Sequence, residues 1–168
     1  MSAARRASRQ AALQVLYALD VGRRTERSPI DEMFEAVAAH FELPEGARAY
    51  AKELVTGVAG SRQEIDALIA EHATNWRVER MAAVDRNVLR MAVYEMRHGA
   101  TPCTVAIDEA VELARRFGSE RSSAFVNGVL DAVARSAEPR QSGAAARRQP
   151  ASDLERRPAS NPQPWEEP

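Results

Sequence analysis

Three arginines stand close together near the start of the chain, at Arg5, Arg6 and Arg9. No other charged side chain precedes Asp20, so they form a local concentration of positive charge on a chain whose formal net charge is -1. The planar guanidinium fork suits phosphate oxygens and base edges. On a helix, Arg5 and Arg9 would repel each other and all three would oppose the helix dipole. This locally unfavourable arrangement predicts contact with a polyanion such as RNA.

A second unusual group lies near the end of the apolar part of the chain, in the segment from Phe125 to Leu130. An aromatic ring, the amide of Asn127 and a glycine interrupt an otherwise apolar helix face. Aromatic rings stack on the bases of single-stranded RNA. The alternative is that Phe125 belongs to the core and that the other two residues allow close helix packing. The two groups form one RNA site only if residues 5–9 and 122–128 meet in space, which their spacing leaves open.

The residue patterns of common enzyme sites are missing. The histidines are far apart in sequence, and neither they nor the single cysteine has metal-ligand spacing. The glycines form no phosphate-binding loop, and Cys103 has no evident general base. We therefore expect no catalytic residue, no metal and no cofactor. The histidines are His40, His72 and His98.

Three acids, Asp108, Glu109 and Glu112, lie in the first half of a predicted helix. Paired carboxylates can act as general acid and base. Acidic side chains near a helix N-terminus are also favoured by the helix dipole. We interpret these three as the solvated face of that helix.

Composition favours closely packed helices. The chain has 168 residues, of which 45% are hydrophobic and only 5% aromatic. With one cysteine there is no internal disulfide, and no stretch resembles a signal peptide or a membrane span. We therefore expect a cytoplasmic protein that does not enter a membrane.

Apolar residues recur with helical spacing along most of the chain. No segment alternates apolar and polar residues as a strand would, so the predicted fold class is all-α with about seven helices. A break is expected near Gly60, where Ser61 to Glu64 forms a capping-box pattern. Pro102 and Gly118 delimit one late helix, Gly118 being suited to a left-handed C′ position, and Ser119 is placed to cap the next. The predicted ranges are 3–21, 28–40, 45–60, 61–69, 83–97, 104–117 and 119–135.

Composition changes after Arg135. Residues 136–168 hold six of the nine prolines and only two sizeable apolar side chains. Such a segment buries too little apolar surface to offset the entropy lost on ordering. We predict one domain over residues 1–135 followed by a disordered tail over 136–168.

Three segments together resemble the NusB family of transcription antitermination factors. They are the arginine-rich start with Gln-Ala-Ala-Leu-Gln-Val-Leu-Tyr17, the central Val84-Asp-Arg-Asn-Val-Leu-Arg-Met-Ala-Val-Tyr-Glu-Met96, and the stretch from Phe117-Gly to Asp131. The resemblance spans about residues 4–135. It implies two packed helical bundles, with an N-terminal part over about 1–75 and a C-terminal part over about 76–135.

The resemblance also implies function and site residues. Family members bind the boxA element of nascent ribosomal RNA together with NusE, a small-subunit ribosomal protein, and help assemble an antitermination complex on RNA polymerase. The RNA-binding residues implied here are Arg5, Arg6, Arg9, Tyr17, Phe125 and Asn127. Acidic positions that face NusE correspond to Glu79 and Asp85. The family includes monomers and homodimers, so the oligomeric state stays open.

Two alternatives remain. The same fold serves as the RNA-binding domain of a ribosomal RNA cytosine methyltransferase, whose catalytic part would be lacking here. A non-catalytic helical adaptor that binds only protein is the other. RNA binding with and without NusE separates the adaptor from an antitermination factor.

Overall fold

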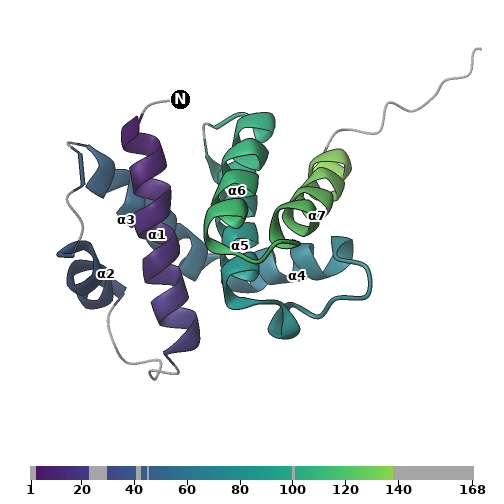
Figure 1. Cartoon of the computed structure of the whole chain (residues 1–168), viewed down its shortest axis with the longest axis horizontal. Coiled ribbons are helices and arrows are strands. Elements are labelled where there is room, and N and C mark those ends of the chain that lie inside the picture. The colour runs from purple at the N-terminus through teal and green to yellow at the C-terminus, as the bar shows by residue number, and fades with distance from the viewer. Residues whose placement is uncertain (1–2, 23–29, 41–42, 45, 100, 138–168) are drawn as a thin grey trace, which may run out of the picture.

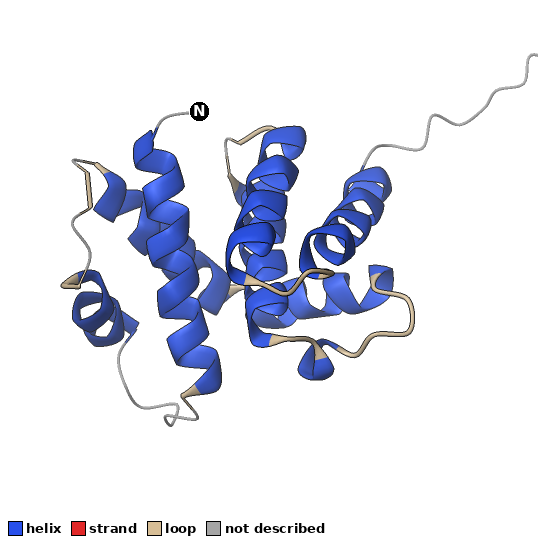
Figure 2. Cartoon of the chain, viewed as in Figure 1, coloured by secondary structure: helices blue, strands red, loops and turns tan. Residues whose placement is uncertain are grey.

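The computed structural model describes residues 3–22, 30–40, 43–44, 46–99 and 101–137. These residues form helices joined by short turns, with no strand among them (Figure 2). The all-α prediction is therefore confirmed. The elements are α1 (Ala3–Val21), α2 (Ile30–Ala38), α3 (Ala47–Gly60), α4 (Arg62–His72), the short 3-10 helix η1 (Val78–Arg80), α5 (Ala83–His98), α6 (Cys103–Phe117) and α7 (Ser122–Ala137).

Helix boundaries follow the local signals closely. α1 ends at Val21, and the N–H of Gly22 donates to the carbonyl of Ala18 at 3.0 Å. The break near Gly60 is confirmed, because α3 ends there and α4 begins at Arg62. The predicted capping box is wrong in its detail, since the side chain of Ser61 makes no capping hydrogen bond.

α5 is the central helix of the molecule. It packs against α1, α3, α4, α6 and α7, while α2 rests on α1 and α3 (Figure 1). α4 lies mainly on α5 and α7. The division into an N-terminal and a C-terminal part near residue 75 stays a prediction.

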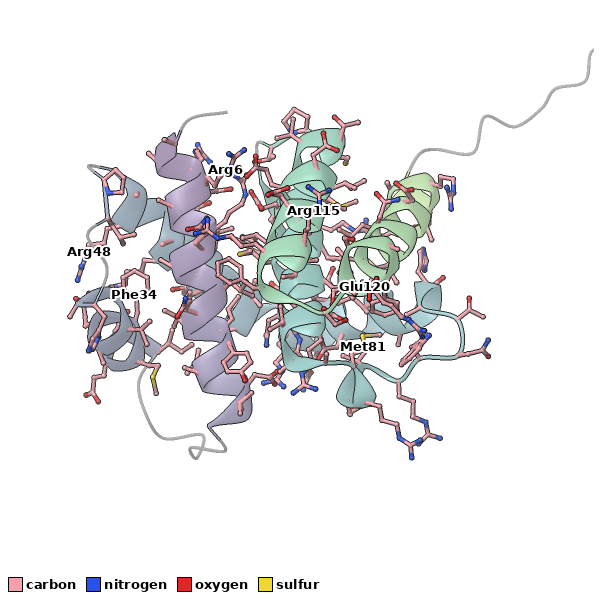
Figure 3. The ribbon with its side chains drawn as sticks, in the orientation of Figure 1. Arg6, Phe34, Arg48, Met81, Arg115 and Glu120 are labelled. Atoms are coloured by element: carbon pink, nitrogen blue, oxygen red, sulfur yellow. The ribbon has the colours of Figure 1, made fainter. Side chains whose placement is uncertain are left out.

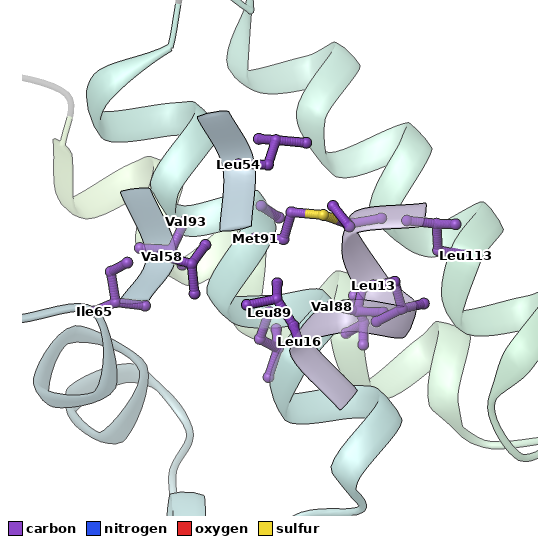
Figure 4. Close-up of a cluster of buried hydrophobic side chains, with 14 of the residues drawn as sticks. Leu13, Leu16, Leu54, Val58, Ile65, Val88, Leu89, Met91, Val93 and Leu113 are labelled. Atoms are coloured by element: carbon purple, nitrogen blue, oxygen red, sulfur yellow. The ribbon is translucent and has the colours of Figure 1, made fainter. Parts of the chain in front are cut away.

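The core is built from aliphatic side chains that meet where α1 and α3 cross α5. Leu54 and Leu89 are fully buried, and Leu16 and Met91 are nearly so (Figure 4). Truncating a buried leucine to alanine costs about 2–5 kcal/mol, because the transfer free energy is lost and a cavity is left. This apolar seam fixes the place of α1, which carries the predicted arginine cluster.

Gly57 of α3 lies against the ring of Tyr94 of α5. A Cβ atom at this position would lie 2.1 Å from Cζ of Tyr94. The ring of Tyr94 therefore occupies the space that any other side chain would need. Packing against Tyr94 therefore explains why a glycine, which is a poor helix former, stands at position 57 inside α3.

Gly118 corrects one prediction. Its φ of -95° is not left-handed, so the expected left-handed C′ residue is absent from the end of α6. A Cβ here would instead lie 2.5 Å from the side chain of Ser122. Close packing between the α6 end and the α7 start accounts for this glycine.

The predicted tail lies almost entirely outside the described residues. Of the range 136–168, only Ser136 and Ala137 are described, and both belong to α7. Among the described helices, none combines the length and apolar character needed to cross a membrane.

Candidate functional site

Arg9 lies inside the molecule, although it belongs to the predicted arginine cluster. Its residue is 1% exposed, and its guanidinium donates to both carboxylate oxygens of Glu95 on α5, at 2.6–3.2 Å. Burial alone would lower the pKa of Arg9, but the hydrogen bonds and charge of Glu95 outweigh it and raise that pKa. The pair therefore ties the first turns of α1 to α5 as ions.

Further groups complete the shell around Glu95. The hydroxyl of Tyr50 on α3 donates to its Oε1, and Thr101 Oγ1 lies 3.3 Å from the same atom. Burial and the hydrogen bond to Glu95 raise the pKa of the Tyr50 hydroxyl. A buried ion pair is stable only when its remaining lone pairs are satisfied, and these two hydroxyls serve that purpose.

Arg6 extends from the same part of α1 toward α6 (Figure 3). Its side chain is 55% exposed and donates to Glu109 on α6 at 3.1 and 3.4 Å. The Glu109 side chain is 8% exposed and also lies 3.8 Å from Arg9. The hydrogen bond and charge of Glu109 raise the pKa of Arg6.

Arg5 occupies the other side of the helix start. It is exposed, and its guanidinium carbon lies 4.0 Å from the ring centroid of Tyr50. Such a cation–π contact is worth about 0.5–1 kcal/mol at an exposed site. The Tyr50 ring thus supports Arg5 while its hydroxyl holds Glu95.

The cluster therefore divides into one buried and two exposed arginines. Arg5 and Arg6 present charge at the surface, whereas Arg9 is enclosed by protein and spends its donors on carboxylates. This geometry is at odds with the expectation that Arg9 contacts RNA directly. Its physical role in this structure is to anchor the helix that carries the other two.

Tyr17 lies further along α1 and is 43% exposed. Tyr17 lies on nearly the same face of α1 as Arg6, because it comes 11 residues later and three turns of helix take about 11 residues. Its ring borders a small apolar hollow of about 180 Å³ that Leu13, Val84 and Phe117 also line. Tyr17 is thus an accessible aromatic on the helix that bears the exposed arginines.

Phe125 is half-buried in the first turn of α7. Its ring centroid lies 5.5 Å from that of Trp76, with the planes tilted by 60°. Asn127, one position beyond the buried Val126, is exposed and donates to Asp131 at 3.1 Å. Phe125 is therefore neither fully core nor free at the surface.

The structure does not bring the arginine cluster and Phe125 together. α1 begins at the upper end of the molecule in Figure 1, whereas α7 begins at the lower end. Arg6 and Arg9 touch Glu109 and Glu95, while Phe125 touches Trp76. The hypothesis that residues 5–9 and 122–128 lie side by side is wrong in this structure.

The two acidic positions expected to face a protein partner differ in exposure. Glu79 is exposed on η1, whereas Asp85 in the first turn of α5 is only 8% exposed. Within the described part of the chain, Oδ1 of Asp85 is buried without a hydrogen-bond partner. Leaving a buried acceptor unsatisfied costs about 1–3 kcal/mol.

A second ion network closes the other end of α1. Asp20, with a side chain 6% exposed, accepts from Arg86 at 2.5 Å and from Asn87 at 2.9 Å, and it lies 3.3 Å from Arg90. Arg90 also donates to Asp66 on α4 at 2.7 and 2.9 Å. Burial alone would raise the pKa of Asp20, but Arg86, Arg90 and Asn87 outweigh it and lower that pKa.

Several of these residues were missed at the level of sequence. Glu109 was interpreted as part of a solvated face, but it is buried because two arginines of α1 turn toward it. Glu95 carried a usable signal, since it is an acid on the apolar face that Val88 and Ala92 define in α5. Asp20 offered no such signal, and its partners Arg86 and Asn87 lie 66 and 67 positions away.

The described residues contain no group of three or more His, Cys, Asp or Glu side chains placed to hold a metal. Cys103 is an exposed free thiol at the start of α6. What the described surface offers instead is arginine charge and partly exposed aromatic rings.

Comparison with known proteins gives a consistent result. The model of the NusB family matches residues 6–135. The chain is 48% identical over 133 residues to the transcription antitermination protein NusB of Solibacter usitatus, covering 79% of this chain and 90% of that protein. It is 46% identical over 132 residues to the NusB of Myxococcus xanthus, covering 78% and 94%.

Solved structures of NusB proteins also match this fold. A structure of T. maritima NusB matches with a TM-score of 0.72 and 33% identity, covering 83% of this chain and 96% of that one. The antitermination factor chain in a crystal structure of NusB and NusE in complex with dsRNA matches with a TM-score of 0.71 and 29% identity, covering 81% and 99%.

Proposed function

Because this chain belongs to the NusB family, we propose that it binds boxA-type single-stranded RNA in nascent ribosomal RNA transcripts together with NusE. It thereby helps to assemble an antitermination complex on RNA polymerase. Its relatives are named as antitermination proteins, so the chain is a transcription factor and not an enzyme. Such a role puts the protein in the cytoplasm.

The observation that carries this proposal is the split arginine cluster on α1. Arg9 is locked to Glu95, so the helix start is held in place without RNA. Arg5 and Arg6 are then presented at the surface in a fixed arrangement, with Tyr17 about 18 Å further along the same helix. Preorganised cations with an accessible aromatic suit a single strand, which is held by charge and by stacking.

NusE is the proposed protein partner, in keeping with the NusB relative solved with NusE and RNA. Glu79 is exposed on η1 and suits a direct contact with a basic side chain. Asp85 contributes a buried oxygen that lacks a donor. That oxygen lies below the surface, so the assignment of Asp85 to the partner surface rests on the family resemblance.

The alternatives are less well supported. The NusB proteins of Solibacter usitatus and Myxococcus xanthus are matched along 90% and 94% of their length, which favours an antitermination factor over a module of a methyltransferase. A protein-only adaptor predicts no RNA binding whether or not NusE is present. Sedimentation of the free chain, with and without RNA, distinguishes a monomer from a homodimer that covers Arg5 and Arg6.

The test is a titration of fluorescent boxA-type RNA at several salt concentrations, with and without NusE. On single-stranded RNA each phosphate contact contributes about -0.7 to the slope of log K against log[salt]. The double variant Arg5→Ala/Arg6→Ala should therefore weaken binding and flatten the slope by about 1.4.

A charge-matched control is Arg48→Ala/Arg135→Ala, which removes two exposed arginines outside the proposed site. This control should leave the slope unchanged. Equal slopes for the wild-type chain and the Arg5→Ala/Arg6→Ala variant would contradict the proposal.

A further inference from the structure

Trp76 stands out on the described surface, because 55% of this large aromatic residue is exposed. It follows α4 in the turn that leads to η1. Burying an indole removes 150–250 Å² of mostly apolar surface from water and is strongly favourable. An indole left this open is available for a ligand that can cover it.

The turn holds Trp76 in place. Asn75 adopts a left-handed backbone conformation with φ 68°, which asparagine tolerates better than most residues. The N–H of Trp76 then donates to the carbonyl of Ala73 at 3.0 Å, and the N–H of Arg80 donates to the carbonyl of Arg77 at 2.9 Å. Exposure of the indole is therefore a property of a defined turn.

Phe125 supports the indole from α7. The two ring centroids are 5.5 Å apart and the planes are tilted by 60°, which is a favourable aromatic geometry. More than half of the Trp76 surface nevertheless remains open. The contact orients the indole and joins the turn to the helix that carries Asn127.

A groove of about 550 Å³ opens beside Trp76. Small side chains of α4, including Ala67 and Ala70, line it together with Trp76 and Arg77. Asp66 also lines it, but its carboxylate is already neutralised by Arg90 at 2.7 and 2.9 Å. The exposed Glu79 lines it as well, so the groove offers the indole ring and the cation of Arg77 together with one acidic side chain.

We propose that Trp76 is a base-stacking residue for single-stranded RNA, with Arg77 beside it to hold a phosphate. This inference rests on the proposed function and extends the RNA path to the α4–η1 turn. Stacking of a base on an aromatic side chain accepts any base, and nearby arginine adds charge to the same contact. Arg77 is exposed, follows Trp76 directly in the chain and lines the same groove, so a cation for a phosphate stands beside the indole.

The experiment uses the full chain carrying Trp165→Phe. Because the sequence has two tryptophans, this change leaves Trp76 as the single source of tryptophan fluorescence. Titration with single-stranded boxA-type RNA should quench its fluorescence in step with binding. Trp76→Leu should weaken binding by about 5- to 100-fold, whereas Trp76→Phe should retain most of the affinity. The salt slope should stay unchanged in both, because stacking releases no counterions.

The matched control is Val21→Ala, at an apolar residue that is 48% exposed at the end of α1. It should bind RNA like the wild-type chain. Thermal unfolding of each variant shows whether the fold is intact. Quenching in the Trp165→Phe chain tests the stacking without altering Trp76.

The outcomes separate this inference from the proposed function. Wild-type RNA binding with no quenching, and with equal affinity in Trp76→Leu, would overturn the stacking role alone. A Trp76→Leu chain that binds RNA normally but no longer binds NusE would show that the indole docks protein and would also overturn it. A wild-type chain that binds no RNA in either arm would overturn both.

Discussion

The two ends of α1 are tied to α5 by ion networks of opposite design. At the start, a buried cation, Arg9, is enclosed by the carboxylate of Glu95. At the end, a buried anion, Asp20, is enclosed by Arg86 and Arg90. Each network also has an exposed arginine at its edge, which is Arg6 paired with Glu109 in the first and Arg62 paired with Asp20 in the second.

The comparison shows that burial decides whether an arginine anchors one helix to another or stays accessible at the surface. Arg9 and Arg90 are both nearly inaccessible and hold helices together. Arg5 and Arg6 differ from Arg9 in sequence position by only one helical turn, yet they remain at the surface. Breaking each network in turn shows whether the two ends contribute equally to the fold.

The largest loss of unfolding free energy is expected when Glu95 is replaced. Replacing it with alanine leaves the guanidinium of Arg9 buried without its carboxylate, which costs about 3–5 kcal/mol of unfolding free energy. Urea unfolding of Glu95→Ala measures the loss. The double variant Arg9→Met/Glu95→Leu should recover most of it, since an apolar pair needs no charge compensation. A loss below about 1 kcal/mol in Glu95→Ala would show that Arg9 escapes to solvent.

A smaller loss of unfolding free energy, which depends on pH, is expected when Asp20 is replaced. Its pKa is lowered from the ordinary 3.8, so its carboxylate stabilises the fold fully above about pH 3.8 and loses this contribution as pH falls through the lowered value. Asp20→Asn should cost about 2 kcal/mol at pH 7. The difference from wild type should shrink below pH 3.8. A constant difference across the acid range would contradict this.

The smallest loss of unfolding free energy is expected at Tyr50, and it depends on pH in the alkaline range. Its pKa is raised from the ordinary 10.0, so the neutral hydroxyl stabilises the fold below about pH 10 and loses this contribution as pH rises through the raised value. Tyr50→Phe should cost about 1 kcal/mol at pH 7. Thermal unfolding from pH 7 to 11 should show the wild-type advantage narrowing only above pH 10.

Much of the fold followed from local signals. Helical periodicity with Gly22, Gly60 and Gly99 beyond or at the helix ends placed α1, α3 and α5 within a residue or two. These signals act over one or two turns of chain, which is why they can be seen in a single sequence. The family resemblance supplied the arrangement of the helices.

The site was predicted only in part, because its geometry depends on distant pairs. Arg9 and Glu95 are 86 positions apart, and nothing local distinguishes Arg9 from Arg5. Trp76 carries no sequence signal of its own, since a single ring outside a helix has no periodic pattern. Its contact with Phe125 appears only when α7 packs beside the α4–η1 turn.

The wide separation of these partners also sets the order in which the chain can fold during synthesis. At about 5–20 residues/s, the ribosome needs roughly 4–17 s to make Glu95 after Arg9, given their separation of 86 positions. Throughout that interval the amino-terminal helix has no carboxylate to receive Arg9. The helix can pack earlier against α3, where Ser8 donates to the carbonyl of Ala47, but its buried ion pair is completed only after the central helix has been made.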